Sequence, residues 1–188
     1  MGKLMYSMGV SADGFIEGPN GDFNWTVPDE KLFRFHTDRI RELGAMLLGR
    51  RLYETMLYWE TGEHDAGFGA DEREFAELWK RLPKVVFSTT LESVQGNARL
   101  ARDGVAEELR RLREELNGDG DLEVGGAALA AQCIELDLVD EYNLFVHPVI
   151  VGGGKPFFPP LAGSLELELI ETRSFGSRVV YLRYERVR

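Results

Sequence analysis

Residues suited to phosphate binding stand where a short apolar strand meets a helix. Leu122 and Val124 mark the strand, Gly125 and Gly126 follow it, and residues 127–136 favour a helix. Backbone N–H groups at such a junction can face an anion, and the helix dipole adds partial positive charge. Taken alone, the stretch fits an ordinary tight turn better than a phosphate site. It gains weight only if other parts of the chain complete a nucleotide site.

Two further strand ends carry groups of the same kind. Residues 45–48 and 84–87 are short, largely apolar runs that are typical of buried strands. The residues that follow them are Gly49, Arg50 and Arg51 in the first case and Ser88, Thr89 and Thr90 in the second. Ligands of parallel α/β sheets bind at the carboxyl ends of strands, so we expect the three junctions to meet at one rim. Arginines at the positive end of a helix are unfavourable without an anion, which favours phosphate binding over a solvated helix face.

A long loop supplies the second half of a candidate site. Residues 11–22 contain three glycines and one proline. Loops of this length are usually functional or disordered, and the aromatic residues in and after this one argue against disorder. Phe15, Trp25 and Phe33 could wall the dry pocket that hydride transfer requires.

Two acidic residues, Asp29 and Glu30, follow Pro28 at the start of the next helix. Glu30, or its neighbour Asp29, could fix or protonate a polar heterocycle in such a pocket. The alternative is that both acids only complement the helix dipole. The residue types support these two interpretations about equally.

Other nucleotide-binding and hydrolytic chemistries lack a motif. Residues 152–155 resemble the tail of a P-loop, but Pro156 stands where a serine or threonine would hold magnesium. No Gly-x-Gly-x-x-Gly follows a strand, and no Gly-x-Ser-x-Gly occurs.

Metal and thiol chemistry are also disfavoured. The three histidines, none of which has metal-ligand spacing, are His36, His64 and His147. Residues 63–65 are typical of a solvated acidic loop rather than a ligand set, so no metal site is predicted. Cys133 falls in a largely apolar helix, where a buried inert thiol is expected.

The composition describes a compact acidic protein. The chain has 188 residues, 44% of them hydrophobic, and 22 basic against 32 acidic residues give a net charge of -10. Such a surface repels nucleic acid and anionic membranes, so neither is an expected partner. A single cysteine excludes an intrachain disulfide. Without a membrane-spanning run or a signal-peptide pattern, we expect a cytoplasmic protein.

Periodicity and capping residues predict alternating strands and helices, and therefore an α/β fold with a mostly parallel sheet. The expected helices run from about Pro28 to a C-terminal cap at Gly44, from a cap at Asp71 to a stop at Pro83, from a cap at Asp103 over residues 105–116, and over residues 127–136. The remaining expected strands are residues 4–10, residues 138–150, and an antiparallel hairpin of residues 166–175 and 178–185.

Five motifs follow one another over nearly the whole chain. They are Ser11-Ala12-Asp13-Gly14-Phe15-Ile16, Gly49-Arg50-Arg51-x-Tyr53-Glu54, Val86-Phe87-Ser88-Thr89, Val124-Gly125-Gly126 and residues 146–154. Together they make the chain resemble the dihydrofolate reductase superfold and, more closely, the reductase domain of the riboflavin-biosynthesis deaminase/reductase and its stand-alone relatives. The resemblance implies one three-layer α/β/α domain over residues 1–188, with about eight mostly parallel strands and an antiparallel C-terminal hairpin. It also implies NADPH as cofactor and a homodimer that pairs through the C-terminal strands.

The resemblance assigns cofactor contacts to named residues. Gly125 and Gly126 would form a cis peptide that faces the pyrophosphate, flanked by Val124, Ala127 and Ala128. Gly49, Arg50 and Arg51 would hold phosphate, including the 2′-phosphate, with help from Ser88 and Thr89. The segment from Val10 to Ile16 would border the nicotinamide.

For the substrate, the resemblance points to two acids. The spacing from Trp25 through Pro28 matches a Trp-x-x-Pro-x-acid run and selects Glu30, while Asp13 matches an aspartate that lies near the substrate in riboflavin-type reductases. With Phe33 as a wall, Glu30 or Asp13 would handle protons. The first substrate expected is a ribosylaminopyrimidine and the second is dihydrofolate.

The chain also departs from these relatives. It has no deaminase zinc motif, no identifiable arginine for a dihydrofolate tail, and only Lys155 as a candidate ribose-phosphate clamp. A different heterocycle or a carbonyl compound therefore stays open as substrate. Two other functions also stay open, namely a nucleotide-binding module without turnover and a purely structural dimer unit.

Overall fold

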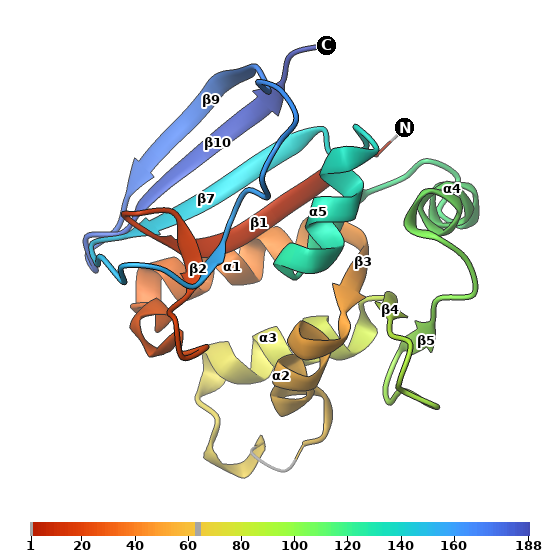
Figure 1. The fold of residues 1–188 in the computed structure, drawn as a ribbon. Helices are drawn as coiled ribbons and strands as arrows, with labels where there is room; N and C mark the ends of the chain where they lie inside the picture. Colours follow the sequence, from red (N-terminus) through yellow and green to blue (C-terminus); the bar gives the residue numbers. More distant parts are fainter. Residues whose placement is uncertain (1, 63–64) are drawn as a thin grey trace.

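The computed structural model describes residues 2–62 and 65–188. Eight strands form one sheet in the order β5-β4-β3-β6-β1-β7-β10-β9 (Figure 1). Their bounds are β1 (Leu4–Ser11), β3 (Leu43–Gly49), β4 (Lys84–Phe87), β5 (Ala98–Leu100), β6 (Asp121–Gly125), β7 (Glu141–His147), β9 (Leu167–Ser174) and β10 (Val180–Arg186). The strands from β5 to β7 are parallel, and β10 pairs antiparallel with both β7 and β9. The predicted mostly parallel sheet with an antiparallel C-terminal hairpin is confirmed.

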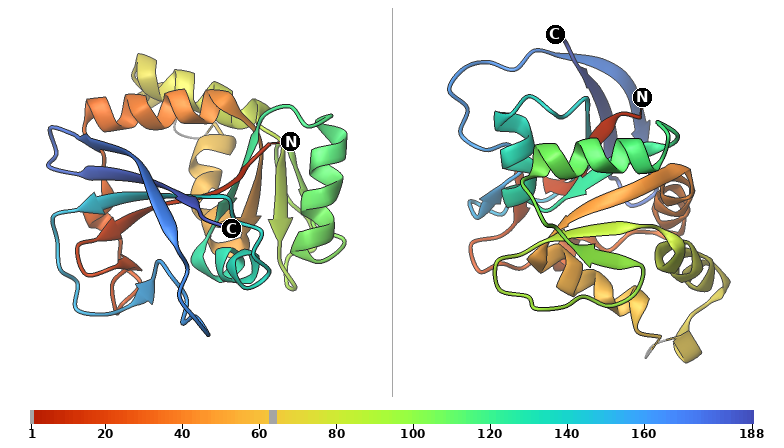
Figure 2. Two further views of the ribbon diagram at one scale, coloured as in Figure 1. Left: turned by 90° about the horizontal axis from the view of Figure 1, so that it is seen from above. Right: turned by 90° about the vertical axis from the view of Figure 1, so that its right-hand side faces the viewer.

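Helices cover both faces of this sheet. They are α1 (Glu30–Glu42), α2 (Arg50–Glu60), α3 (Ala70–Arg81), α4 (Val105–Glu115) and α5 (Ala127–Glu135), with short 3-10 helices at Asn24–Thr26 and Asp65–Gly67. Helices α1 and α3 lie on one face and α5 on the other (Figure 2). Two short strands, β2 (Phe15–Glu17) and β8 (Lys155–Pro156), form a separate antiparallel pair. In the described part of the chain, no helix has the length and apolar character needed to cross a membrane.

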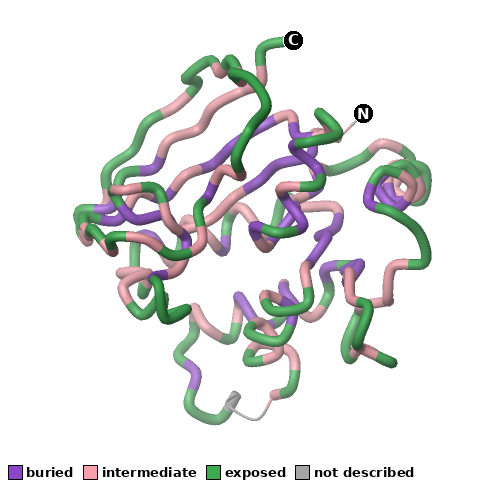
Figure 3. Tube along the Cα trace, viewed as in Figure 1, coloured by how far each residue is buried: buried purple, intermediate pink, exposed green. Residues whose placement is uncertain are grey.

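The core is divided by the alternation of side chains along the strands. In β3, Ala45 and Leu47 face the core cluster under α4 and α5, whereas Met46 and Leu48 face the cluster formed with α3. A strand with apolar side chains on both faces has to be covered on both faces. The central strands are accordingly the most buried part of the trace (Figure 3).

Local hydrogen bonds explain where the helix boundaries differ from expectation. Helix α1 begins at Glu30 because the Asp29 carboxylate caps it, accepting the N–H of Leu32 at 2.8 Å. The α3 cap is Gly69, not Asp71, and the Gly69 N–H donates to Glu72 at 2.6 Å.

Two other expected caps were also wrong. The cap of α4 is Gly104, because the Asp103 carboxylate instead accepts from Arg111 at 2.7 Å. Gly44 is not a helix cap but part of β3, where a side chain would lie 2.8 Å from Leu116 Cδ1.

Three other features departed from expectation. Strand β7 covers only Glu141–His147, shorter at both ends than residues 138–150. The segment expected as a loop at residues 11–22 contains β2, which pairs with β8. Strand β5 was not expected at all, since three residues are too few to show periodicity.

Core packing on β3 makes a direct prediction about stability. Leu47 is fully buried, so L47A should lower the free energy of unfolding by about 2–5 kcal/mol through lost burial and a cavity. L136A makes the same change at a side chain that is 55% exposed and should cost much less. Urea unfolding of both variants tests this. Equal losses would contradict the placement of β3 at the centre of the sheet.

Candidate active site

The three predicted junctions meet at one edge of the sheet. Strand β3 lies between β4 and β6, with Gly49 opposite Phe87 and Leu48 opposite Gly125. All three strands run in the same direction, so their carboxyl ends lie side by side. The backbones are close enough that a Cβ on Gly126 would stand 3.8 Å from Gly49 Cα.

The glycine pair turns the chain without a cis peptide. The described chain contains no cis bond, so the expected cis link between Gly125 and Gly126 was wrong. The change of direction comes instead from Gly126, whose φ of 98° is open to glycine and disfavoured for other residues. Helix α5 begins directly afterwards at Ala127, leaving its first N–H groups at this edge.

The β4 end is a hydroxyl-lined turn. Ser88 Oγ accepts the N–H groups of Thr90 at 3.1 Å and Leu91 at 3.0 Å. Arg50, in the first turn of α2, donates to Thr90 Oγ1 at 3.1 Å. Arg50, Ser88 and Thr89 therefore belong to one exposed corner of the sheet edge.

A cavity of about 530 Å³, here called the junction cavity, opens at this edge. Its lining includes Ile16, Arg51, Thr55, Gly126, Ala127 and Lys155. Glu17 stands between the two cations, with a carboxylate oxygen 3.2 Å from Lys155 Nζ and 3.9 Å from an Arg51 guanidinium nitrogen. Basic groups, a helix start and bare glycine backbone fit the phosphates of a dinucleotide.

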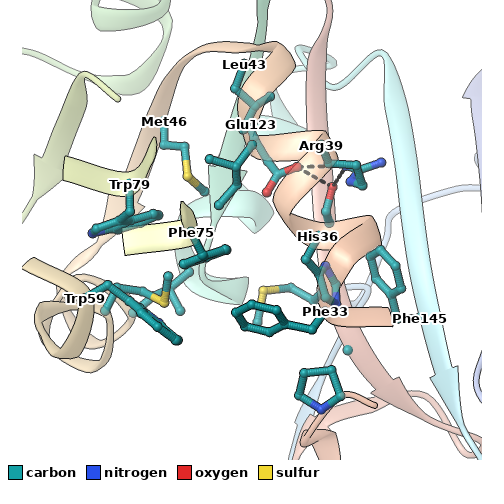
Figure 4. Close-up of a pocket in the computed structure, with 17 residues that line it drawn as sticks. Phe33, His36, Arg39, Leu43, Met46, Trp59, Phe75, Trp79, Glu123 and Phe145 are labelled. Carbon is teal, nitrogen blue, oxygen red and sulfur yellow. Dashed lines mark hydrogen bonds and ion pairs between the residues drawn. The ribbon is translucent and has the colours of Figure 1, made fainter. Parts of the chain in front are cut away.

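A second cavity of about 280 Å³, here called the aromatic cavity, adjoins the first. Both are lined by Met8, Gly9, Leu52 and Met56. Its aromatic walls are Phe33, Trp59, Phe75, Trp79 and Phe145, contributed by α1, α2, α3 and β7 (Figure 4).

One end of the aromatic cavity is polar. Glu123 Oε2 accepts a hydrogen bond from Ser7 Oγ at 2.7 Å and one from Arg39 at 2.9 Å (Figure 4). Arg39 also donates to Ser7 Oγ at 2.7 Å and to the Tyr181 hydroxyl at 3.0 Å. Tyr181 in turn donates to Asn143 at 2.6 Å, so a chain of hydrogen bonds crosses the sheet from β6 to β10.

His36 also faces the aromatic cavity, from α1. Burial, and next the positive charge of Arg39, lower the pKa of His36 to about 4. Its imidazole is therefore neutral near pH 7. With Arg39 paired to Glu123, the polar groups of the cavity carry no net charge.

The structure separates the two acids predicted as catalytic from both cavities. Glu30 is exposed in the first turn of α1 and lines neither cavity. Asp13 ties two loops together, accepting the N–H groups of Val151 at 3.2 Å and Gly152 at 2.8 Å. A hydrogen bond from Ser11 is the main cause that lowers the pKa of the Asp13 carboxyl, with Gly152 adding to it. A carboxyl group held ionised in this way is a poor proton donor.

Some of the other predicted site residues line one of the two cavities, and the rest lie outside both. Phe33 lines the aromatic cavity, whereas Trp25 lines neither cavity and packs its ring edge against His147 at 5.4 Å between centroids. The cofactor candidates in the junction cavity are Ile16, Arg51, Gly126 and Ala127. Val10 and Val124 are buried within β1 and β6, and Ala128 is exposed on α5.

The sequence predicted no metal site and a buried, inert Cys133 thiol. No cluster of three or more His, Cys, Asp or Glu suited to a metal occurs among the described residues, and Glu63 and His64 lie outside them. Cys133 is fully buried, as predicted, and burial raises the pKa of its thiol to about 12.

The polar end of the aromatic cavity was missed from sequence. Its members, Ser7, Arg39 and Glu123, come from three separate elements, and none belongs to a known short motif. One signal was available. Glu123 is a charged residue between the apolar Leu122 and Val124 of a central strand, so it points to the opposite face and needs a partner there.

These elements and paired cavities define an α/β protein with a dihydrofolate reductase-like fold. Dihydrofolate reductase from Enterococcus faecalis, complexed with NADP(H) and RAB-propyl, superposes with a TM-score of 0.64 at 17% identity, covering 98% of this chain and 96% of that one. The chain belongs to the RibD C-terminal domain family, which matches residues 2–181.

The chain is also similar to a further bacterial protein in sequence and to a further solved structure in fold. The Bacillus subtilis (strain 168) protein YyaP, itself uncharacterized, is 32% identical over 182 residues, or 97% of this chain and 94% of YyaP. A putative riboflavin biosynthesis protein from Shewanella sp. PV-4 superposes with a TM-score of 0.78 at 22% identity, covering all of both chains.

The backbone at Gly126 gives the first prediction for this site. G126A should lower the free energy of unfolding by about 1–2 kcal/mol, because an L-residue is disfavoured at this positive φ. G163A is the matched control, since Gly163 is exposed and a Cβ added there would meet no atom within 4 Å. Urea unfolding compares the two variants. A stable G126A protein would mean that the junction has another backbone conformation.

The hydrogen bonds that the Asp13 carboxylate accepts from the loop at Val151 and Gly152 should make the stability of the protein depend on pH. The pKa of Asp13 is lower in the folded chain, so its stabilisation is complete above the ordinary aspartate pKa of about 4 and is lost as pH falls through the folded value. D13N should therefore be less stable than wild type at pH 7, with a difference that shrinks towards pH 2–3. D119N makes the same change at an exposed aspartate and is the matched control. Chemical unfolding at several pH values measures the difference in free energy of unfolding between wild type and D13N. A difference that does not change with pH would contradict the role of the Asp13 carboxylate in holding the two loops.

Proposed function

We propose that this chain is an NADPH-dependent reductase that transfers hydride to a small heterocyclic or ribosylaminopyrimidine-type substrate. The reference activity is that of 5-amino-6-(5-phosphoribosylamino)uracil reductase in riboflavin biosynthesis, with dihydrofolate as the second candidate substrate. The observation that carries the proposal is that three neighbouring strand ends bring arginine, hydroxyl and bare glycine groups to one edge of the sheet, directly beside an aromatic cavity. Family membership supports it.

In this proposal the junction cavity binds the cofactor phosphates. The start of α5 and the bare backbone of Gly126 would face the pyrophosphate, and Arg51 is the cation best placed for the 2′-phosphate. Arg50, Ser88 and Thr89 would border the adenosine end from the adjoining corner. Glu17, which now stands near Arg51 and Lys155, would give up part of that attraction when phosphate binds.

The shared wall of the two cavities would be the place of reaction. Bound NADPH supplies a hydride, and reduction of a C=N or C=O bond also takes up one proton. Gly9 lines both cavities without a side chain, so the two ligands can approach each other there. The aromatic walls exclude water from the acceptor carbon.

The proton that accompanies the hydride has to reach the substrate in the aromatic cavity. Asp13 and Glu30 would have to act from outside both cavities, and Asp13 is already engaged with two backbone N–H groups. Solvent entering through the junction cavity is the simpler source. The proposal further takes residues 1–188 as one domain of a cytoplasmic homodimer that acts on a small molecule and binds neither nucleic acid nor membrane.

Cofactor preference tests the proposal. NADPH should raise the melting temperature more than NADH, and R51Q should weaken NADPH binding about tenfold through loss of a charge-assisted contact, with little change for NADH. R110Q removes an exposed arginine of α4 and should change neither. Thermal shift and calorimetry measure binding, and absorbance at 340 nm with a panel of heterocycles and carbonyls measures turnover.

The outcomes separate the candidate functions. Absence of binding by either nucleotide would reject the reductase assignment and favour a structural unit. Tight NADPH binding without oxidation of NADPH across the panel would favour a nucleotide-binding module without turnover.

A further inference from the structure

At the polar end of the aromatic cavity, only one of the two oxygens of the Glu123 carboxylate is hydrogen-bonded within the described part of the protein. Glu123 Oε2 accepts from both Ser7 and Arg39. Among the described residues, no hydrogen bond reaches the other carboxylate oxygen, Oε1. The Glu123 side chain lines the cavity and is 13% exposed. Oε1 is not among the fully buried side-chain atoms that lack a partner, so water reaches it in the free protein. A ligand that displaces this water without supplying a donor would leave the oxygen unpaired, which is costly.

A network of hydrogen bonds on the side away from the cavity fixes the orientation of the Glu123 carboxylate. Arg39 is held at the same time by Glu123, Ser7 and the Tyr181 hydroxyl, and Tyr181 is fixed by Asn143. The guanidinium also lies 5.9 Å from the centre of the Phe145 ring. Because Ser7 and Arg39 both engage Oε2, the free oxygen is always Oε1. The cavity therefore presents a carboxylate acceptor at a defined place.

The charge of the cavity limits which ligands fit. Arg39 is the one arginine among the described residues that line the cavity, and Glu123 already neutralises it at 2.9 Å. His36 is neutral, since burial lowers its pKa to about 4. A phosphate or carboxylate in this cavity would lose its hydration without gaining a free cation, and it would be repelled by Glu123. Two other cations of the cleft, Arg51 and Lys155, line the junction cavity and not the aromatic cavity, and Glu17 lies near both of them.

The volume and walls give the shape of the ligand. About 280 Å³ is at the small end for ligand pockets, and the walls are aromatic rings and thioethers from several elements. Such walls favour a flat ring that stacks between them. A donor-free apolar ring would fill the space but would bury Glu123 Oε1 without a partner.

We propose that the aromatic cavity selects a small, flat, uncharged ring that carries an N–H donor, recognised by Oε1 of Glu123. Ser7 and Arg39 are positioning residues that keep this oxygen aimed into the cavity. The substrate class follows from the proposed reductase function, because the cavity adjoins the cofactor edge. The aromatic cavity would exclude a phosphoribosyl group. A ribosylaminopyrimidine substrate would therefore have to place its phosphoribosyl group outside this cavity.

A pair of probes tests the donor requirement without the cofactor. Quinazoline-2,4-dione is a flat, uncharged bicyclic ring with two N–H groups, and its 1,3-dimethyl derivative has none. Calorimetry with wild-type protein should give at least about tenfold tighter binding for the N–H compound, as expected for one hydrogen bond to a charged group. The 6-carboxylate of the same ring should bind worse than the parent.

The variant E123Q separates hydrogen bonding from methyl bulk. Ser7 and Arg39 both donate to the Oε2 position, so the glutamine oxygen should occupy it and the amide NH₂ should replace Oε1. The cavity would then present a donor in place of an acceptor. Affinity for the N–H compound should fall about tenfold, while that for the dimethyl compound should stay or rise.

Two further variants complete the design. S7A removes one of the two hydrogen bonds that fix Oε2, so it should lower the ratio of the two affinities without abolishing binding. A purely structural role for Ser7 would weaken both probes equally. E115Q makes the same change as E123Q at an exposed position of α4 that lines neither cavity, and it should leave both affinities unchanged. Circular dichroism and NADPH affinity of E123Q report whether the fold and the junction cavity are intact.

The outcomes distinguish this inference from the proposed function. If NADPH binds but the two probes bind equally, or if E123Q weakens both alike, the inference is overturned and the reductase proposal stands. If the probes differ and E123Q reverses the difference while NADPH does not bind, the ring site is supported and the reductase proposal fails.

Discussion

The parallel pairing of β3 with β4 on one side and β6 on the other is the constraint on which the cleft depends. It places Gly49, Ser88 and Gly126 at neighbouring strand ends, although they are up to 77 residues apart in the chain. The pairing is stable because apolar side chains cover both faces of β3. A shift of one residue would turn Leu47 away from its cluster and separate the glycine backbones as well.

The part of the fold that could be predicted is the part encoded locally. Lys84–Phe87 is a short apolar run between a proline and a hydroxyl-rich turn, and the structure has β4 at those bounds. The convergence of the three junctions followed from one general rule about parallel strands, and the strand order bears it out. Caps were less predictable. Asp71 and Asp103 are good capping residues, but both form ion pairs with arginines, and glycines occupy the cap positions.

The convergence of residues at the junction cavity was predictable, whereas the composition of the aromatic cavity was not. Glycines and arginines at strand ends are visible in sequence because their roles depend on adjacent residues. The polar end of the aromatic cavity depends on tertiary contacts, since Arg39 reaches Glu123 across 84 positions of the chain. Asp29 and Glu30 were ambiguous between a ligand and the helix dipole. The structure gives Asp29 the cap and leaves Glu30 exposed.

The position of a carboxylate in the fold decides whether it needs a cation as partner. A carboxylate in the first turn of α1 is at the positive end of a helix and near solvent, where it needs no other partner. A carboxylate in the middle of β6 is stable only if a cation reaches it, and Arg39 does so from the third turn of α1. That ion pair consumes the positive charge and leaves one oxygen unused. A neutral cavity with a free carboxylate oxygen is thus the result of placing an acid on a central strand, and this arrangement is the basis for proposing neutral N–H-bearing rings rather than anions as its ligands.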